Sequence, residues 1–403
     1  MDVELSSVLL YLAVFLIGAK LGGILAAKLG QPGVFGELIV GILIGPSIAG
    51  TISQNLFGTS LYINPGAPAG QFMSLLGELG IIILMFIAGL SIDVGEFRKS
   101  GKPSTIVAAS GVAVAFLLGF GAASIFGWTL LEAGFAGGIL VATSVGITVR
   151  TLMEINVLHT KVGMTILGAA VIDDVMGIIV LSVLSGLAFG GLSFLGISET
   201  LALMGIFFAV VLSVGFKIIP RALAYVGRFS VDEIVLSFAF AIVFLVAAIA
   251  ERVSIAAITG AFLIGLIASK SPATESLKEK ASTVGYGLLI PLFFVNMGVQ
   301  TNLQALSAVS ILALAFLAIA MFDKIVGCGL GALLSGYGVK DSLRVGIGMM
   351  PRAEVALIMA AIGVKASVVG QSLLSMTVMV VLLTSLVTPP LVKIAFKGAE
   401  KEK

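Results

Sequence analysis

The chain has 403 residues, of which 59% are hydrophobic and only 11% are charged. A soluble domain carries roughly 25% charged residues, so a soluble protein would have no interior able to hold this much apolar surface. The formal net charge of +2 is too small to indicate nucleic acid as a partner, and a lone cysteine, Cys328, argues against a disulfide framework. The composition therefore indicates a polytopic protein whose main partner is the lipid bilayer.

Apolar segments of about 20 residues, the length of a membrane-crossing helix, recur along the whole chain. A transmembrane barrel would instead alternate in segments of about ten residues. The first segment has no basic region before it and no small-residue cleavage site, so we interpret it as a retained span and not a signal peptide. The sequence predicts an all-α protein with about thirteen transmembrane helices: 5–28, 33–50, 71–91, 103–127, 132–153, 162–189, 197–225, 231–250, 253–270, 281–299, 305–334, 341–363 and 368–396.

The basic residues orient these helices. If the N-terminus lies outside, eighteen of the 23 Lys and Arg residues fall on the cytoplasmic side, two fall outside and three lie within spans. This distribution follows the positive-inside rule, and a missed or merged helix would scramble it. We therefore expect an odd number of spans, with the N-terminus outside and the C-terminus in the cytoplasm.

Two of the predicted helices contain residues that favour a break. The fifth carries Thr143 and Ser144 in mid-span, and the twelfth carries Pro351, which removes a backbone donor. If spans one to six and eight to thirteen form two inverted repeats, these helices occupy matching positions, as in transporters built around discontinuous helices. Small and hydroxyl residues also let continuous helices pack closely, so the matched position is what favours two breaks.

Asp173 and Asp174 begin about eleven residues into the sixth helix, or roughly 17 Å at 1.5 Å per residue, near the centre of a ~30 Å core. An ionised carboxylate there costs at least ~2.5–3.5 kcal/mol. Neighbours on a helix point about 100° apart, so both acids cannot face one small target. We expect one acid to hold a fixed cation and the other to stay available. Lys324 in the eleventh helix is the obvious cation, because the adjacent Asp323 does not face it.

Four other charged residues have open roles. Arg352 cannot give up its proton, and we interpret it with Glu354 as a structural ion pair across the break in the twelfth helix. Glu37 and Glu78 lie towards the ends of their spans, where they serve either as polar anchors or as the lining of a funnel.

A carboxylate in the membrane also suggests a mechanism. An ionised carboxylate without a bound ligand is too costly to move through the membrane, so it can move only after it binds a proton or a small cation. A group that accepts either ligand but must hold one to move would exchange the two. Thr143, Ser144 and the carbonyl groups of an unwound fifth helix could complete an oxygen shell of the kind that hard cations prefer. Two coupled acids and a lysine also allow more than one proton per cycle.

These residues belong to a recognisable pattern. The chain resembles prokaryotic monovalent cation/proton antiporters of the branch that includes Kef-type proteins and the bacterial sodium/proton antiporters with a thirteen-helix fold. The resemblance covers essentially the whole chain and is carried by the acid pair, the deep lysine and the segments 30–46, 78–90, 142–149, 168–175 and 291–298.

The resemblance implies a domain organisation. Spans one to three (1–102) and eight to ten (226–300) would form a dimerisation domain. Spans four to six (103–190) and eleven to thirteen (301–397) would form a core transport domain, with a linker helix at 191–225. The fifth and twelfth spans would cross at the midplane as broken helices.

The resemblance also implies roles for the site residues. Asp174 would be the shared seat of Na⁺ and H⁺, and Asp173 and Thr143 would help to hold the metal ion. Asp173 would pair with Lys324. The expected activity is electrogenic exchange of Na⁺ or Li⁺ for H⁺ by elevator-like alternating access. The protein would be a homodimer in the prokaryotic inner membrane with a part in pH homeostasis, and it would be neither an enzyme nor dependent on a cofactor.

Other functions fit the same pattern less closely. Kef-type relatives carry a cytosolic nucleotide-binding domain, whereas this chain stops soon after its last helix, so gating of that kind is not expected. Exchange of K⁺ for H⁺ on the same scaffold is the nearest alternative. A channel or a cation sensor without turnover comes from another class, and a sodium-coupled solute symporter would need a second polar cluster that the sequence does not offer.

Overall fold

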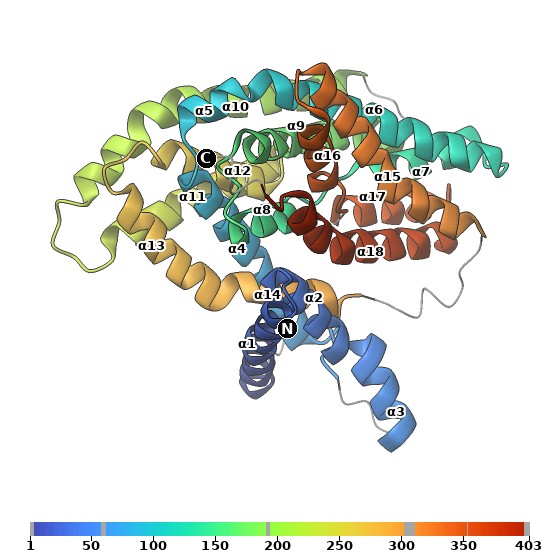
Figure 1. Cartoon of the computed structure of the whole chain (residues 1–403), viewed down its shortest axis with the longest axis horizontal. Coiled ribbons are helices and arrows are strands. Elements are labelled where there is room, and N and C mark those ends of the chain that lie inside the picture. The colour runs from blue at the N-terminus through green and yellow to red at the C-terminus, as the bar shows by residue number, and fades with distance from the viewer. Residues whose placement is uncertain (1–3, 58–61, 191–193, 302–310, 353, 399–403) are drawn as a thin grey trace.

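The computed structural model describes residues 4–57, 62–190, 194–301, 311–352 and 354–398, and all the regular structure in these ranges is helical. Figure 1 shows the arrangement. The elements are α1 (Leu5–Lys28), α2 (Gly33–Ile44), the π-helix η1 (Pro46–Gly50), α3 (Thr51–Phe57), α4 (Pro68–Leu90), α5 (Val94–Lys99), α6 (Gly101–Ile125), α7 (Leu130–Val141), α8 (Val145–Glu154), α9 (Lys161–Ala188), α10 (Phe194–Val226), α11 (Ile234–Arg252), α12 (Ala257–Ala268), α13 (Thr274–Val284), the π-helix η2 (Gly285–Leu289), α14 (Ile290–Val299), α15 (Ile311–Leu334), α16 (Val339–Gly348), α17 (Glu354–Lys365) and α18 (Gln371–Ala395).

The fold class predicted from the sequence is confirmed, although the exact number of spans is not. Within the described residues, eleven helical stretches are long and apolar enough to cross a membrane. The predicted ninth and twelfth spans correspond to shorter apolar helices, Ala257–Ala268 and Val355–Lys365. Residues 305–310 of the predicted eleventh span and 191–193 of the predicted linker helix lie outside the described residues.

The helices pack into two groups. One, the crossover group, consists of α6 to α9 and α15 to α18: α6 packs along α15, α7 and α9, and α17 packs against α7 and α18. The other, the flanking group, consists of α1, α2, α4 and α10 to α14: α4 packs along α12 and α14, and α2 packs along α1 and α14. Figure 1 shows α1, α2 and α14 at one end, away from α6, α15 and α17. The transport and dimerisation roles of such groups stay predictions.

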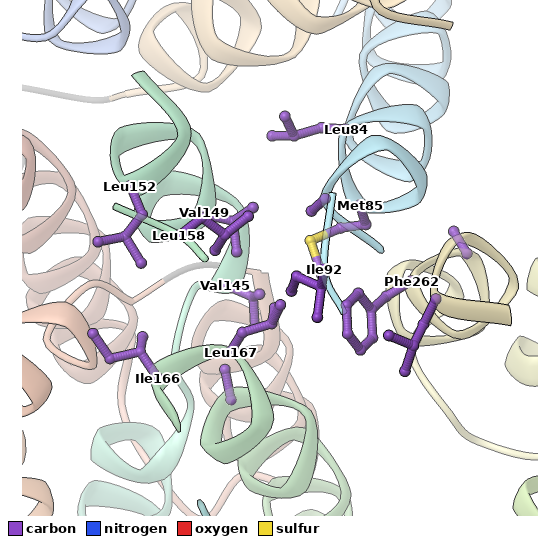
Figure 2. Close-up of a cluster of buried hydrophobic side chains, with 14 of the residues drawn as sticks. Leu84, Met85, Ile92, Val145, Val149, Leu152, Leu158, Ile166, Leu167 and Phe262 are labelled. Carbon is purple, nitrogen blue, oxygen red and sulfur yellow. The ribbon is translucent and has the colours of Figure 1, made fainter. Parts of the chain in front are cut away.

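The boundary between the two groups is largely apolar. Val145 and Val149 of α8 and Leu167 of α9 belong to the same buried cluster as Met85 of α4 and Phe262 of α12. Figure 2 shows these side chains facing one another across the boundary. Apolar contacts are non-directional, so this part of the boundary holds the groups together without directional bonds.

Candidate ion-binding site

The site begins at two breaks that contact each other. Residues 142–144 are extended and separate α7 from α8, and residues 349–352 interrupt the run from α16 to α17. The Ser144 N–H donates to the Pro351 carbonyl oxygen at 2.7 Å, and the Thr148 hydroxyl donates to the Gly348 carbonyl oxygen at 2.6 Å. Peptide groups at a helix end have no partner within the helix, and here each break supplies partners to the other. The two broken helices predicted from the sequence are confirmed.

Helix α18 supports the second break. The Arg352 N–H donates to the Thr384 hydroxyl at 3.1 Å, and the Ser385 hydroxyl donates to the Arg352 carbonyl oxygen at 3.1 Å. All three residues are buried. The non-helical backbone at this depth is thus enclosed by protein, the condition under which irregular backbone is tolerated inside a membrane.

Asp173 and Lys324 form a buried ion pair beside the crossing. The Lys324 ammonium lies 2.5 Å from Asp173 Oδ1, and the two side chains are 0% and 1% exposed. The other carboxylate oxygen of Asp173 has no hydrogen-bond partner in the described part of the chain, and neither has the buried hydroxyl of Thr143 in the first break. Buried polar atoms are normally satisfied, so these two oxygens have capacity left for a ligand. Ser144, next to Thr143, is buried as well.

A second buried ion pair lies next to the first along α15. One terminal nitrogen of Arg352 (Nη2) lies 2.6 Å from each carboxylate oxygen of Asp323, and its other terminal nitrogen donates to the Met350 carbonyl oxygen at 3.1 Å. The backbone N–H of Lys324 also donates to Asp323. Two anions and two cations are therefore enclosed together, which limits the desolvation cost of each charge.

The structure gives Arg352 a partner that the sequence did not indicate. The side chain of Glu354, the proposed partner, lies outside the described residues, and the partner that the structure gives is Asp323. A signal was available in the sequence: a carboxylate deep in a span that cannot face the adjacent Lys324 needs another cation.

Asp174 lies at the boundary between the two helix groups. It is partly buried, in contrast to the fully buried Asp173. The hydroxyl of Thr259, in the first turn of α12, donates to Asp174 Oδ2 at 3.4 Å. The two adjacent acids thus have different surroundings, as helix geometry requires: Asp173 faces α15, whereas Asp174 faces a helix of the flanking group. Sequence reasoning did not single out Thr259, because one uncharged residue in an apolar helix gives no signal.

A further polar cluster joins α8 to the flanking group. The Arg150 guanidinium lies 2.7 Å from Glu154 and 3.7 Å from the buried Glu37 of α2, and it stacks 4.4 Å above the Tyr286 ring. Glu154 also accepts the N–H of Gly33, the first residue of α2, at 2.7 Å. Glu37 thus contacts α8 through Arg150, whereas Glu78 is exposed. The choice between a polar anchor and a funnel lining stays a prediction for both residues.

We expect Glu154→Gln to destabilise the protein by about 1–3 kcal/mol, because the Arg150 guanidinium exchanges its nearest carboxylate for a neutral amide acceptor and hydrogen bonds to charged groups are the stronger ones. Arg150 would keep only the more distant Glu37 as an anion, so thermal unfolding in detergent should begin at a lower temperature. Glu96→Gln is the matched control, because Glu96 pairs with Lys99 on the surface, where both side chains are more than half exposed. An unfolding temperature lowered equally in both variants would contradict the expectation.

Broken helices that cross beside buried acids, in an all-helical membrane protein, define the class of secondary transporters with discontinuous helices. Residues 13–398 match the family described as sodium/hydrogen exchanger, transmembrane. The chain belongs to this family, and it is a secondary transporter and not an enzyme.

Individual relatives cover nearly the whole chain. It is 33% identical over 390 residues to the Na⁺/H⁺-K⁺ antiporter GerN of Bacillus cereus, covering 97% of this chain and 96% of GerN. It is 33% identical over 433 residues to the high-affinity Na⁺/H⁺ antiporter NhaS3 of Synechocystis, covering 99% and 92%. The structure of the sodium/proton antiporter MjNhaP1 from Methanocaldococcus jannaschii superimposes with a TM-score of 0.70 at 17% identity, covering 98% of each chain. That likeness concerns the fold.

Proposed function

We propose that this protein exchanges Na⁺ or Li⁺ for H⁺ across the membrane, with Asp174 as the shared site of cation and proton. The observation that carries the proposal is the asymmetry of the acid pair: Asp173 is neutralised by Lys324, whereas Asp174 lies at the boundary of two helix groups. The names of full-length relatives at 33% identity support the same ions.

Competition for one carboxylate accounts for the exchange. With either a proton or a monovalent cation bound, Asp174 carries no net charge. Only in these two states is the free-energy cost of moving it through an apolar barrier low. Thr143, Asp173 and Ser144 would add oxygen ligands, and the unused buried oxygens of Thr143 and Asp173 support their part in this assignment. No cofactor enters this scheme.

We propose that the crossover group moves against the flanking group. The flanking group would also hold two copies of the chain together as a homodimer. The apolar cluster at the boundary between the two groups supports a sliding motion, because its contacts are non-directional. The polar contacts of Arg150, Glu154 and Thr259 across the boundary would have to break and re-form during the movement. The distribution of basic residues supports an N-terminus outside and a C-terminus in the cytoplasm.

We expect Lys324→Gln to make the exchange electroneutral. If the Lys324–Asp173 pair carries the second proton of each cycle, the wild type moves one net charge, worth ~2.3 kcal/mol per 100 mV, and the variant moves none. The measurement is the dependence of exchange on an imposed membrane potential in proteoliposomes. Lys270→Gln, which changes an exposed lysine at the end of α12, should keep the voltage dependence. A Lys324→Gln protein that stays voltage-dependent would refute the second-proton role.

The choice of cation is tested by the purified protein in proteoliposomes that contain a pH-sensitive dye. Addition of Na⁺ or Li⁺ should drive proton release, with half-maximal response at lower concentration than for K⁺. K⁺ is the second candidate, because GerN is named for it as well as for Na⁺. Currents far above carrier rates would indicate a channel, and cation binding without proton movement would indicate a sensor; either result would overturn the proposal.

A further inference from the structure

We propose that Thr259 of α12 is a further residue of the ion site, positioning the Asp174 carboxylate from the flanking group. This inference rests on the proposed function, since it assigns a partner to the same carboxylate. It brings to the site a residue from outside the crossover group, whose helices carry the acids, the lysine and the two breaks.

The contact crosses the boundary between the groups. Asp174 belongs to α9, whereas α12 packs against α4, α10 and α11. Thr259 is 1% exposed, and its hydroxyl lies 3.4 Å from Asp174 Oδ2. The remainder of α12 is apolar apart from glycine, so this is the point at which the helix meets the acid pair with a polar group.

The direction of the Thr259 hydroxyl differs from that of three buried threonines inside helices. The hydroxyl groups of Thr151, Thr377 and Thr388 all donate to the carbonyl four residues earlier in their own helices. Thr259 is the third residue of α12, so that carbonyl lies before the helix begins. Its hydroxyl donates to the carboxylate of another helix group instead.

Two physical effects make this contact favourable to an ionised Asp174. The hydroxyl is a donor to the charged oxygen, and the first turn of a helix carries partial positive charge. The buried charged groups beside Asp174 include Asp173 on the same helix, Lys324 and Asp323 on α15, and Arg352 at the second break. Lys324 pairs with Asp173 and Arg352 pairs with Asp323, and the donor from α12 supports the Asp174 anion from the other helix group.

The same hydroxyl suits a bound cation. A threonine oxygen both donates and accepts, so it can turn from a donor to the empty carboxylate into an oxygen ligand of Na⁺ or Li⁺. If the two groups slide past each other, α9 leaves α12, and this contact exists in one access state only. Thr259 would then raise the cation affinity of that state relative to the other.

The test is proton-coupled Na⁺ and Li⁺ exchange by Thr259→Val and Thr259→Ser in proteoliposomes, measured over a range of pH. Valine keeps the shape and removes the hydroxyl. We expect Thr259→Val to raise KM for the cation about three- to tenfold, the range set by one hydrogen bond, with a smaller change in kcat. Loss of the donor disfavours the anion, so protons compete better and the pH of half-maximal activity should move upward. Serine should restore both values.

Thr377→Val is the matched control, because Thr377 is equally buried but donates within its own helix; KM should stay at the wild-type value. A wild-type KM for Thr259→Val at every pH would overturn the inference, as would a Thr259→Ser protein impaired as much as the valine variant. The proposed function is tested separately. Wild-type protein without cation/proton exchange would overturn that function. An unaffected Thr259→Val protein beside an inactive Asp174→Asn protein would overturn only the role of Thr259.

Discussion

An Asp174→Asn protein is expected to bind the transported cation about a thousandfold more weakly and to show no exchange above the background of empty liposomes. At an effective dielectric constant of about 20, a cation ~4 Å from a carboxylate gains about 4 kcal/mol, which corresponds to roughly three orders of magnitude in affinity. Asparagine keeps the shape of the side chain and loses this attraction. It also cannot take up a proton at any accessible pH, so both halves of the exchange stop together.

The measurement is dye-reported proton movement after Na⁺ or Li⁺ addition, with protein orientation and yield in the liposomes matched to wild type. Asp232→Asn serves as the control, since it removes an exposed aspartate in the turn before α11 and should leave exchange unchanged. Wild-type activity in Asp174→Asn would sink the assignment of Asp174 as the shared site. Loss of exchange with an intact unfolding temperature would separate a binding defect from a folding defect.

The helix breaks were predictable because each leaves a local mark in the sequence. Pro351 lacks a backbone donor, and Thr143 and Ser144 interrupt an apolar run with groups that bond to backbone. The apolar runs predicted the membrane helices for the same local reason, although the count of thirteen spans is not confirmed. Whether each is long enough to cross a membrane depends on where the helix ends, and the helix at 257–268 is shorter than its apolar segment suggests.

The partners of buried charges were harder to predict, because they depend on how distant segments meet. Arg352 and Asp323 are 29 residues apart, and they meet because α15 packs along α16, the helix that leads into the second break. Glu37 and Arg150 meet where α2 packs on α8, which the sequence does not encode locally. Thr259 carries no charge, so a search for charged residues within the membrane helices does not find it.

Removing either partner of the Arg352–Asp323 pair should destabilise the fold more than any other single change considered for this site. Asp323→Leu leaves a guanidinium that is 0% exposed without an anion, and breaking a buried pair in this way costs about 3–5 kcal/mol. Arg352→Met leaves the Asp323 carboxylate with the Lys324 backbone N–H. Each variant should unfold well below the wild-type temperature in detergent.

The double variant Arg352→Met with Asp323→Leu distinguishes two effects on stability. One is the loss caused by leaving a single charge unpaired, and the other is the stability that the intact pair contributes. Apolar groups of similar volume can replace a buried ion pair with little loss, so the double variant should recover much of the stability that each single variant loses. Such non-additivity is the expected signature of two groups in direct contact. Additive losses in the double variant would mean that the two charges contribute separately, for example through the Met350 carbonyl and the Lys324 N–H. A double variant that folds but does not exchange would instead show that the pair fixes the crossing in the geometry that Asp174 needs.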